Sequence, residues 1–232
     1  MQLRMLNTGS SPYATRCRMA LYAKGVEVRL FPPPDGLGSV AYQALHPFIK
    51  VPTLWIEDGA GARDTLQESM AILEWIDEAF PTPPLKPIAA GPRAHMRMIA
   101  QLFDQSVMTH LMRLFPERDP KTRDTRIVDA GLAAIADGFD RIEHHLPASG
   151  FAAGPELTLA DCVAMPILYL VLDFMPHFGA VSPLATRPVS AGYWQRLLQH
   201  DLVKRIHAEM AEHLAAARAA RFAKEAASRA GP

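Results

Sequence analysis

The chain has 232 residues, 49% of them hydrophobic and 21% charged, which is typical of a globular protein with a sizeable core. Its 24 basic and 24 acidic residues give a formal net charge of zero, which argues against nucleic acid or an anionic membrane as a partner and favours a small or neutral one. Two cysteines cannot staple a fold or build a metal cluster, and no apolar run approaches the roughly 20 residues that span a bilayer, so we expect a cytoplasmic protein.

The first 25 residues predict a strand, a tight turn and a helix. Residues 3–6 form a short apolar run, which the turn residues Thr8 to Ser11 interrupt. Ser11 is a good helix N-cap, Pro12 fits the first helical position and Gly25 fits the stop. Free backbone N–H groups and the helix dipole make such a helix start favourable for an anion, whether phosphate, carboxylate or thiolate. On the local pattern alone, an ordinary N-cap is the commoner role for this serine.

Two further strands and two helices are predicted up to residue 80. Residues 26–31 alternate apolar and charged side chains, as a half-buried strand does. A short helical or irregular piece around 40–45 precedes a strand over 50–59, and residues 60–64 could return as its hairpin partner. Residues 67–80 place apolar side chains on one helical face. The expected order is therefore βαβ, a linker with a helix, and ββα.

A linker is predicted over 81–91, because four prolines fall within residues 81–87 and no periodicity is visible there. We place the domain boundary at this linker, between residues 1–80 and an all-helical domain over 92–232. Helices are expected over 93–115, 125–146, 158–175 and 193–214. Thr158 and Asp161 form a capping-box variant at the start of the third. The basic, alanine-rich end over 214–232 is either a surface helix or a frayed tail, without a nucleic-acid role.

Four separated motifs resemble those of the cytosolic glutathione transferases, in their bacterial, serine-type form with some similarity to the zeta class. They are SPYATRCR over 11–18, HPFIKVPTL over 46–54, LQESMAI over 66–72 and LTLAD over 157–161. The resemblance covers nearly the whole chain. It implies an α+β, thioredoxin-like N-terminal domain (βαβ-ββα) followed by an all-α C-terminal domain.

The resemblance also implies which residues hold glutathione. The Ser11 hydroxyl would donate to the thiolate of bound glutathione while accepting a hydrogen bond from its own helix, with Ser10 as a second candidate. Val51, before a cis proline, would pair its backbone with the cysteinyl part of the tripeptide. Lys50 matches a position that reaches the glycine carboxylate, and its alternative is a solvated lysine.

The γ-glutamyl end of glutathione is expected at Glu68 and Ser69. Glu68 can pair with the amino group, and the Ser69 hydroxyl and nearby N–H groups can receive the carboxylate. A first-turn carboxylate and a helix cap would explain both residues without a ligand. Asp104 loosely resembles a residue that reaches the same amino group across a dimer. No metal is implied.

The implied activity is that of a glutathione S-transferase, which activates the thiol of glutathione for attack on a small hydrophobic electrophile, as a homodimer active in detoxification. A glutathione-dependent isomerase or dehalogenase of the maleylacetoacetate isomerase (zeta) type is an alternative, although Pro12 and Tyr13 depart from that class. A non-enzymatic binding module of the same fold is another. A disulfide oxidoreductase is disfavoured, because Ser11 and Ala14 stand where its thiols would be.

Candidate side chains for the electrophile pocket are Phe103, Met108, Met112, Phe115, Tyr169 and Phe174.

Overall fold

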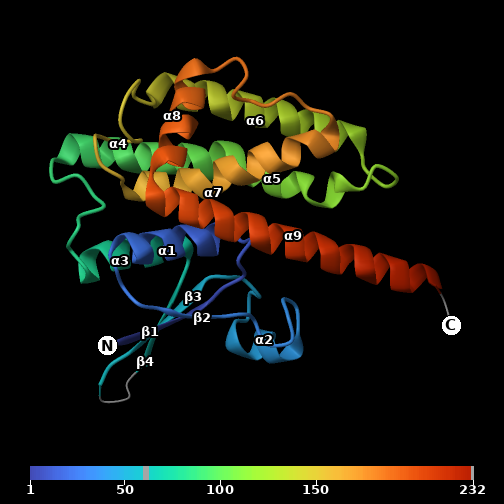
Figure 1. The fold of residues 1–232 in the computed structure, drawn as a ribbon, viewed down its shortest axis with the longest axis horizontal. Coiled ribbons are helices and arrows are strands. Elements are labelled where there is room, and N and C mark those ends of the chain that lie inside the picture. Colours follow the sequence, from blue (N-terminus) through green and yellow to red (C-terminus); the bar gives the residue numbers. More distant parts are fainter. Residues whose placement is uncertain (60–62, 231–232) are drawn as a thin grey trace.

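The computed structural model describes residues 1–59 and 63–230, which form a small sheet beneath a large helical body (Figure 1). The four strands are β1 (Gln2–Leu6), β2 (Arg29–Phe31), β3 (Thr53–Glu57) and β4 (Arg63–Gln67), in the order β2-β1-β3-β4. β1 pairs with β2 in parallel and with β3 antiparallel, and β3 pairs antiparallel with β4. The predicted hairpin partner over 60–64 lies partly outside the described residues.

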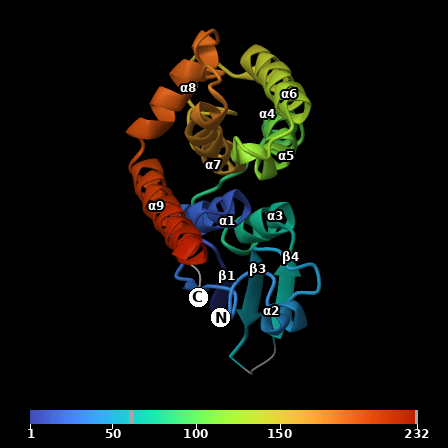
Figure 2. The ribbon, with the colours of Figure 1, turned by 90° about the vertical axis from the view of Figure 1, so that its right-hand side faces the viewer.

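Three helices accompany the sheet: α1 (Pro12–Ala23), α2 (Val40–Leu45) and α3 (Ser69–Ala79). α1 and α3 lie side by side between the sheet and the helical body (Figure 2). The predicted βαβ-ββα order is confirmed, but β2 is shorter than the strand expected over 26–31. The cause is the end of α1, where Gly25 has a φ of 64° and the backbone N–H of Val26 donates to Leu21 at 3.0 Å. That bond holds Val26 against the helix and away from the sheet.

The helical body contains more breaks than its apolar periodicity indicated. Its segments are α4 (Ala90–Gln101), the π-helical η1 (Leu102–Met108), α5 (Thr109–Leu114), η2 (Pro116–Arg118), α6 (Thr125–His145), α7 (Leu159–Phe174), η3 (Met175–Phe178), α8 (Pro188–Gln199) and α9 (Asp201–Ala230). The single helix predicted over 193–214 was wrong, because His200 is extended with a ψ of 128° and separates α8 from α9. The basic end of the chain is helical up to Ala230.

A cluster around a buried salt bridge connects the linker to the sheet-containing part and to the helical body. The buried Lys24 ammonium lies 2.6 Å from the Asp77 carboxylate, which also accepts a hydrogen bond from the Leu85 backbone at 2.8 Å. The Leu85 carbonyl in turn accepts from the backbone N–H of Leu159 at 2.9 Å. The ends of α1 and α3 are thereby connected to the start of α7 through the linker.

The central helix of the core is α7, and it corrects one expectation about apolar runs. The stretch Leu159–Phe178 is long and apolar enough to cross a membrane by length and composition, and 78% of its window is buried inside the fold. A core helix surrounded by other helices is apolar on all sides for the same reason. Asp161 and Asp173 interrupt the run, so it is apolar on average and not residue by residue.

The start of α7 is set by the capping box expected from the sequence. The Asp161 carboxylate is buried and accepts hydrogen bonds from the Thr158 backbone N–H and hydroxyl, both at 2.7 Å. It also accepts from the Ala152 backbone at 2.9 Å and the Tyr193 hydroxyl at 2.7 Å. This carboxylate therefore joins the loop before α7 to α8.

We expect Thr158→Ala to lower the free energy of unfolding by about 1 kcal/mol or more, because the helix loses its N-cap hydroxyl. Thr158→Ser, which keeps the hydroxyl, should lose much less. Urea unfolding of both variants measures the difference, and equal losses would contradict the capping role.

A second cap comes from another helix. Glu143 on α6 accepts hydrogen bonds from the backbone N–H groups of Val189 and Ser190, at 2.8 and 2.7 Å, and from the Ser190 hydroxyl at 2.6 Å. These are the free N–H groups at the start of α8. Burial works to raise the pKa of Glu143, but the bonds from Ser190 and Val189 outweigh it and lower that pKa below its usual value.

We expect the stabilisation from Glu143 to be present at neutral pH and to fade in acid. Because the folded-state pKa is the lower one, the contribution is complete above the unfolded value near 4.5 and is lost as pH falls through the folded value. Glu143→Gln should be less stable than the unmodified chain by about 1 kcal/mol at pH 7. Thermal unfolding from pH 7 to 3 tests this, since a gap that stays constant would exclude the carboxylate as its source.

Candidate functional site

A cavity of about 590 Å³ lies where the turn before α1, the loop before β3, the start of α3 and the end of α5 come together. All five residues predicted to bind or activate the ligand lie on its wall: Ser11, Lys50, Val51, Glu68 and Ser69. Ser10 lines the same cavity. Three segments that are far apart in the sequence therefore present polar groups to one space, and the end of α5 adds an apolar side.

Ser11 caps α1 as its sequence context predicted. It is extended, with φ −72° and ψ 122°, and its Oγ accepts a hydrogen bond from the Ala14 backbone N–H at 3.3 Å. Its own N–H donates to the Thr8 carbonyl at 3.0 Å, which closes the turn. A hydroxyl has one donor and two acceptor sites, so the cap uses an acceptor and leaves the hydrogen available to a ligand.

The loop that carries Lys50 and Val51 is held rigidly from behind. The Val51–Pro52 peptide bond is cis, and the Tyr42 hydroxyl donates to the Lys50 carbonyl. Ile49 has a φ of 55°, a region that a β-branched residue rarely adopts. Lys50 itself is exposed at the cavity mouth, where an ammonium can meet a carboxylate.

Glu68 and Ser69 begin α3, but not in the way that a simple cap would. Glu68 occupies the N-cap position with φ 67° and ψ 111°, and its side chain makes no capping hydrogen bond. A positive φ at a non-glycine residue costs of order 1–3 kcal/mol and occurs preferentially at binding sites. The exposed Glu68 carboxylate is thus free of the capping role that would have explained it without a ligand.

An ion pair behind Ser69 was missed by the sequence reading. The Arg16 side chain is fully buried and donates to both oxygens of Asp104, at 2.7 and 2.5 Å. Arg16 also donates to the Ser69 hydroxyl at 3.5 Å and lies 5.0 Å from the ring centre of Tyr13. Asp104 belongs to the π-helical η1, where widened helical segments often mark functional sites. Its partner in this chain is Arg16, and the expectation that Asp104 reaches across a dimer stays a prediction.

The apolar wall of the cavity is smaller than predicted. Of six candidate side chains, Met112 and Phe115 line it. Phe103 and Met108 are fully buried in the core, Tyr169 packs against His207, and Phe174 stacks behind Phe115 with ring centres 4.4 Å apart. The helical periodicity of these residues identifies a buried face without saying which part of it borders a cavity.

Neither cysteine is suited to chemistry. Burial raises the pKa of the Cys17 thiol to about 12 and raises that of Cys162 strongly, so both stay protonated at neutral pH. Burial, and then the Asp104 carboxylate, also raises the pKa of Tyr13, whose phenol remains a neutral donor beside the cavity. Within residues 1–59 and 63–230, no group of three His, Cys, Asp or Glu side chains could hold a metal ion.

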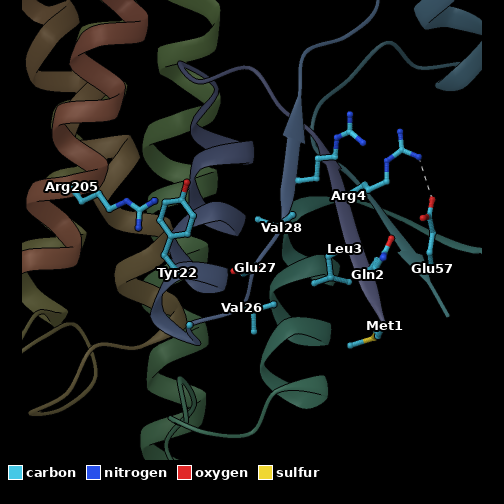
Figure 3. Close-up of a pocket in the computed structure, with 12 residues that line it drawn as sticks. Met1, Gln2, Leu3, Arg4, Tyr22, Val26, Glu27, Val28, Glu57 and Arg205 are labelled. Carbon is cyan, nitrogen blue, oxygen red and sulfur yellow. Dashed lines mark hydrogen bonds and ion pairs between the residues drawn. The ribbon is translucent and has the colours of Figure 1, made fainter. Parts of the chain in front are cut away.

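A larger hollow of about 850 Å³ lies between β1, the residues after α1 and α9 (Figure 3). Two of its arginines are paired with carboxylates, since Arg4 lies 3.3 Å from Glu57 and Arg205 lies 3.0 Å from Glu209. None of the five predicted site residues lines it. The smaller cavity is therefore the candidate site.

Two helix N-termini reach the candidate site, those of α1 and α3, and both favour anions. Glu68 adds an acceptor for an ammonium group, and Lys50 adds a donor for a second carboxylate. The arrangement can hold a zwitterionic ligand along its length and place a sulfur anion at Ser11.

Comparisons with known proteins found matches to both parts of the chain. Residues 10–79 match the family model "Glutathione S-transferase, N-terminal domain", and residues 102–201 match "Glutathione S-transferase, C-terminal domain". The chain is 32% identical to a maleylpyruvate isomerase of Ralstonia sp, over 71% of this chain and 80% of the relative. It is 28% identical to a stringent starvation protein A homolog of Coxiella burnetii, over 74% and 75% respectively.

Among solved structures, the chain resembles a glutathione S-transferase of Methylobacterium radiotolerans in complex with glutathione sulfonate. The TM-score is 0.73 and the identity 25%, over 88% of this chain and 94% of that one. The similarity extends through both the sheet-containing part and the helical body.

Proposed function

Because this chain belongs to the glutathione S-transferase family, we propose that it binds glutathione in the cavity at Ser11 and activates its thiol for attack on a small hydrophobic electrophile. Glutathione is then a substrate that remains in the product. The observation that carries the proposal is the meeting of five side chains and two helix N-termini at one cavity.

The chemistry rests on a proton equilibrium of the ligand. When the thiol of glutathione loses its proton to solvent, the Ser11 hydroxyl donates to the thiolate and the start of α1 stabilises its charge. Both effects lower the thiol pKa and raise the population of the nucleophile at neutral pH. The thiolate then forms a bond to the electrophilic carbon, and the leaving group departs with its electron pair.

The rest of the tripeptide is positioned by the other four residues. Glu68 pairs with the γ-glutamyl amino group, and the start of α3 with the Ser69 hydroxyl receives its carboxylate. The Val51 backbone hydrogen-bonds to the cysteinyl residue, and Lys50 meets the glycine carboxylate. Met112 and Phe115 provide the apolar surface for the electrophile.

Two alternatives have support of their own. A glutathione-dependent isomerase of the zeta type is favoured by the 32% identity to a maleylpyruvate isomerase. There the same thiolate would add to a double bond and leave again after rotation. A non-enzymatic binding module is favoured by the similarity to a stringent starvation protein A homolog, whose name states no reaction.

One set of measurements separates the three. The chain is applied to immobilised glutathione and eluted with free glutathione, and is then assayed for conjugation of a generic aryl halide and for isomerisation of a maleylacetoacetate-type compound. We expect retention and conjugation. Isomerisation without conjugation would favour the first alternative, retention without either reaction the second, and a chain that is not retained would contradict all glutathione-based readings.

The proposal also covers the location, the oligomeric state and the domain division of the protein. We propose a cytoplasmic homodimer that serves in detoxification, with the division at 81–91 separating a glutathione-binding unit from a helical unit. The two family models, which match on either side of that segment, support the division. A sedimentation run that showed monomer alone would count against the dimer.

A further inference from the structure

The last helix of the chain lies against the turn that carries Ser11. α9 runs alongside α1 in both views (Figures 1 and 2). Gly9, in the middle of the turn, is buried with no room for a side chain, because a Cβ there would lie 1.8 Å from Cδ2 of the His213 ring. The imidazole of His213 therefore covers the backbone of Gly9 directly.

A buried arginine connects the same turn to the same helix. The Arg18 guanidinium donates to the side chain of Asn7 at 2.9 Å and to the Gly9 carbonyl at 3.4 Å. It also donates to the Thr15 hydroxyl at 3.3 Å. Its Nε lies 3.1 Å from the Glu209 carboxylate of α9, and only 1% of its side chain is exposed. One cation thus bridges the turn, α1 and α9.

The contacting face of α9 is itself firmly anchored. Glu209 pairs with Arg205 at 3.0 Å, and the Arg205 guanidinium stacks 3.7 Å from the ring centre of Tyr22 on α1, as Figure 3 shows. Val203 and Met210, on the same helix, are fully buried in the core. α9 therefore presents Glu209 and His213 to the turn from a fixed backbone.

We propose that Glu209 and His213 of α9 are positioning residues for the Ser11 hydroxyl, with Arg18 as the link, so that the last helix sets how well the site stabilises the thiolate. This inference rests on the proposed function. A donor must be held within a few tenths of an ångström to stabilise developing or bound charge fully. Ser11 lies two residues after Gly9, and its N–H closes the turn onto Thr8, so a displaced Gly9 moves the hydroxyl.

The first test removes the carboxylate. We expect Glu209→Ala to lower the thiolate fraction of bound glutathione near neutral pH about 10-fold, which corresponds to one unit in the thiol pKa. kcat should fall in proportion, while KM for glutathione changes less than about 2-fold, because the other subsites are untouched. Glu209→Gln, which keeps an oxygen for Arg18, should recover much of the loss. Glu212→Ala, an exposed carboxylate of the same helix, is the matched control and should match the unmodified chain.

The second test uses the close packing at Gly9. Gly9→Ala should force the His213 ring away from the turn and lower kcat about 10-fold, whereas His213→Ala should have a smaller effect. The double variant should be no worse than His213→Ala alone, because the clash needs both side chains. Losses that simply multiply would show that Gly9 acts independently of α9.

The deciding measurement is the thiol pKa of glutathione in the complex, obtained from the thiolate absorbance as a function of pH. A general loss of protein stability would not change this pKa. If Glu209→Ala and His213→Ala bind glutathione with the thiol pKa of the unmodified chain, the positioning role is wrong. Should the unmodified chain itself form no thiolate, or Ser11→Ala form as much, the proposed function fails instead.

Discussion

Ser11→Ala is expected to lower kcat/KM for aryl halide conjugation about 10²-fold near neutral pH, because it removes the hydroxyl that we propose donates to the sulfur. The thiol pKa of bound glutathione should rise toward its value in water, so part of the activity returns as pH is raised. Retention on immobilised glutathione should persist, since Lys50, Val51, Glu68 and Ser69 remain. The measurement is a pH profile of kcat/KM together with the thiolate absorbance of the complex.

The same substitution also removes the cap of α1, and a second variant separates the two effects. Ser11→Asp keeps an oxygen that accepts from the Ala14 backbone, so the fold should retain its stability. It cannot donate, and its charge repels the thiolate, so activity should fall at least as far as in Ser11→Ala. Ser10→Ala serves as the neighbouring control. An active Ser11→Ala, or a loss confined to Ser10→Ala, would overturn the assignment of Ser11.

Asp104→Ala is expected to destabilise the fold by about 3–5 kcal/mol, because it leaves the fully buried Arg16 charge without its partner. The affinity for glutathione should fall about 10-fold as well, since Arg16 no longer holds the Ser69 hydroxyl in place. Asp104→Asn, which retains one oxygen for Arg16, should show a smaller version of both effects. Denaturant unfolding and calorimetric titration with glutathione measure the two losses.

A paired substitution distinguishes packing from binding at this position. Replacement of a buried ion pair by apolar residues of similar volume is often neutral for stability. Arg16→Met combined with Asp104→Leu should therefore recover most of the unfolding free energy while the affinity for glutathione stays low. Recovery of both would mean that the ion pair has no part in binding.

The features that could be predicted from the sequence are those that depend on residues close together in the chain. Ser11 with Pro12 is a local helix-start signal, Thr158 with Asp161 is a local cap, and both were found where expected. The βαβ-ββα order followed from the alternation of apolar and polar residues, because that period is a property of neighbouring positions. The resemblance of four motifs then selected five residues, all of which lie on the wall of one cavity.

The features that could not be predicted depend on which distant segments pack together. The Arg16–Asp104 pair joins α1 to η1, and neither residue carries a local signal for the other. The positive φ of Glu68 is imposed by its surroundings and not by its type. The division between α8 and α9 at His200 was missed because helical periodicity continues across it. Each of these features depends on long-range contacts, which cannot be recognised in a single sequence.

The contact between Gly9 and His213 has a consequence for the order in which the protein is made. Gly9 leaves the ribosome well before His213, which lies far later in the chain, although the two residues touch in the finished fold. Domains generally fold as units during synthesis, the N-terminal one first. The nascent sheet can thus form before α9 exists, and the turn that carries Ser11 acquires its final cover only once α9 has been synthesised.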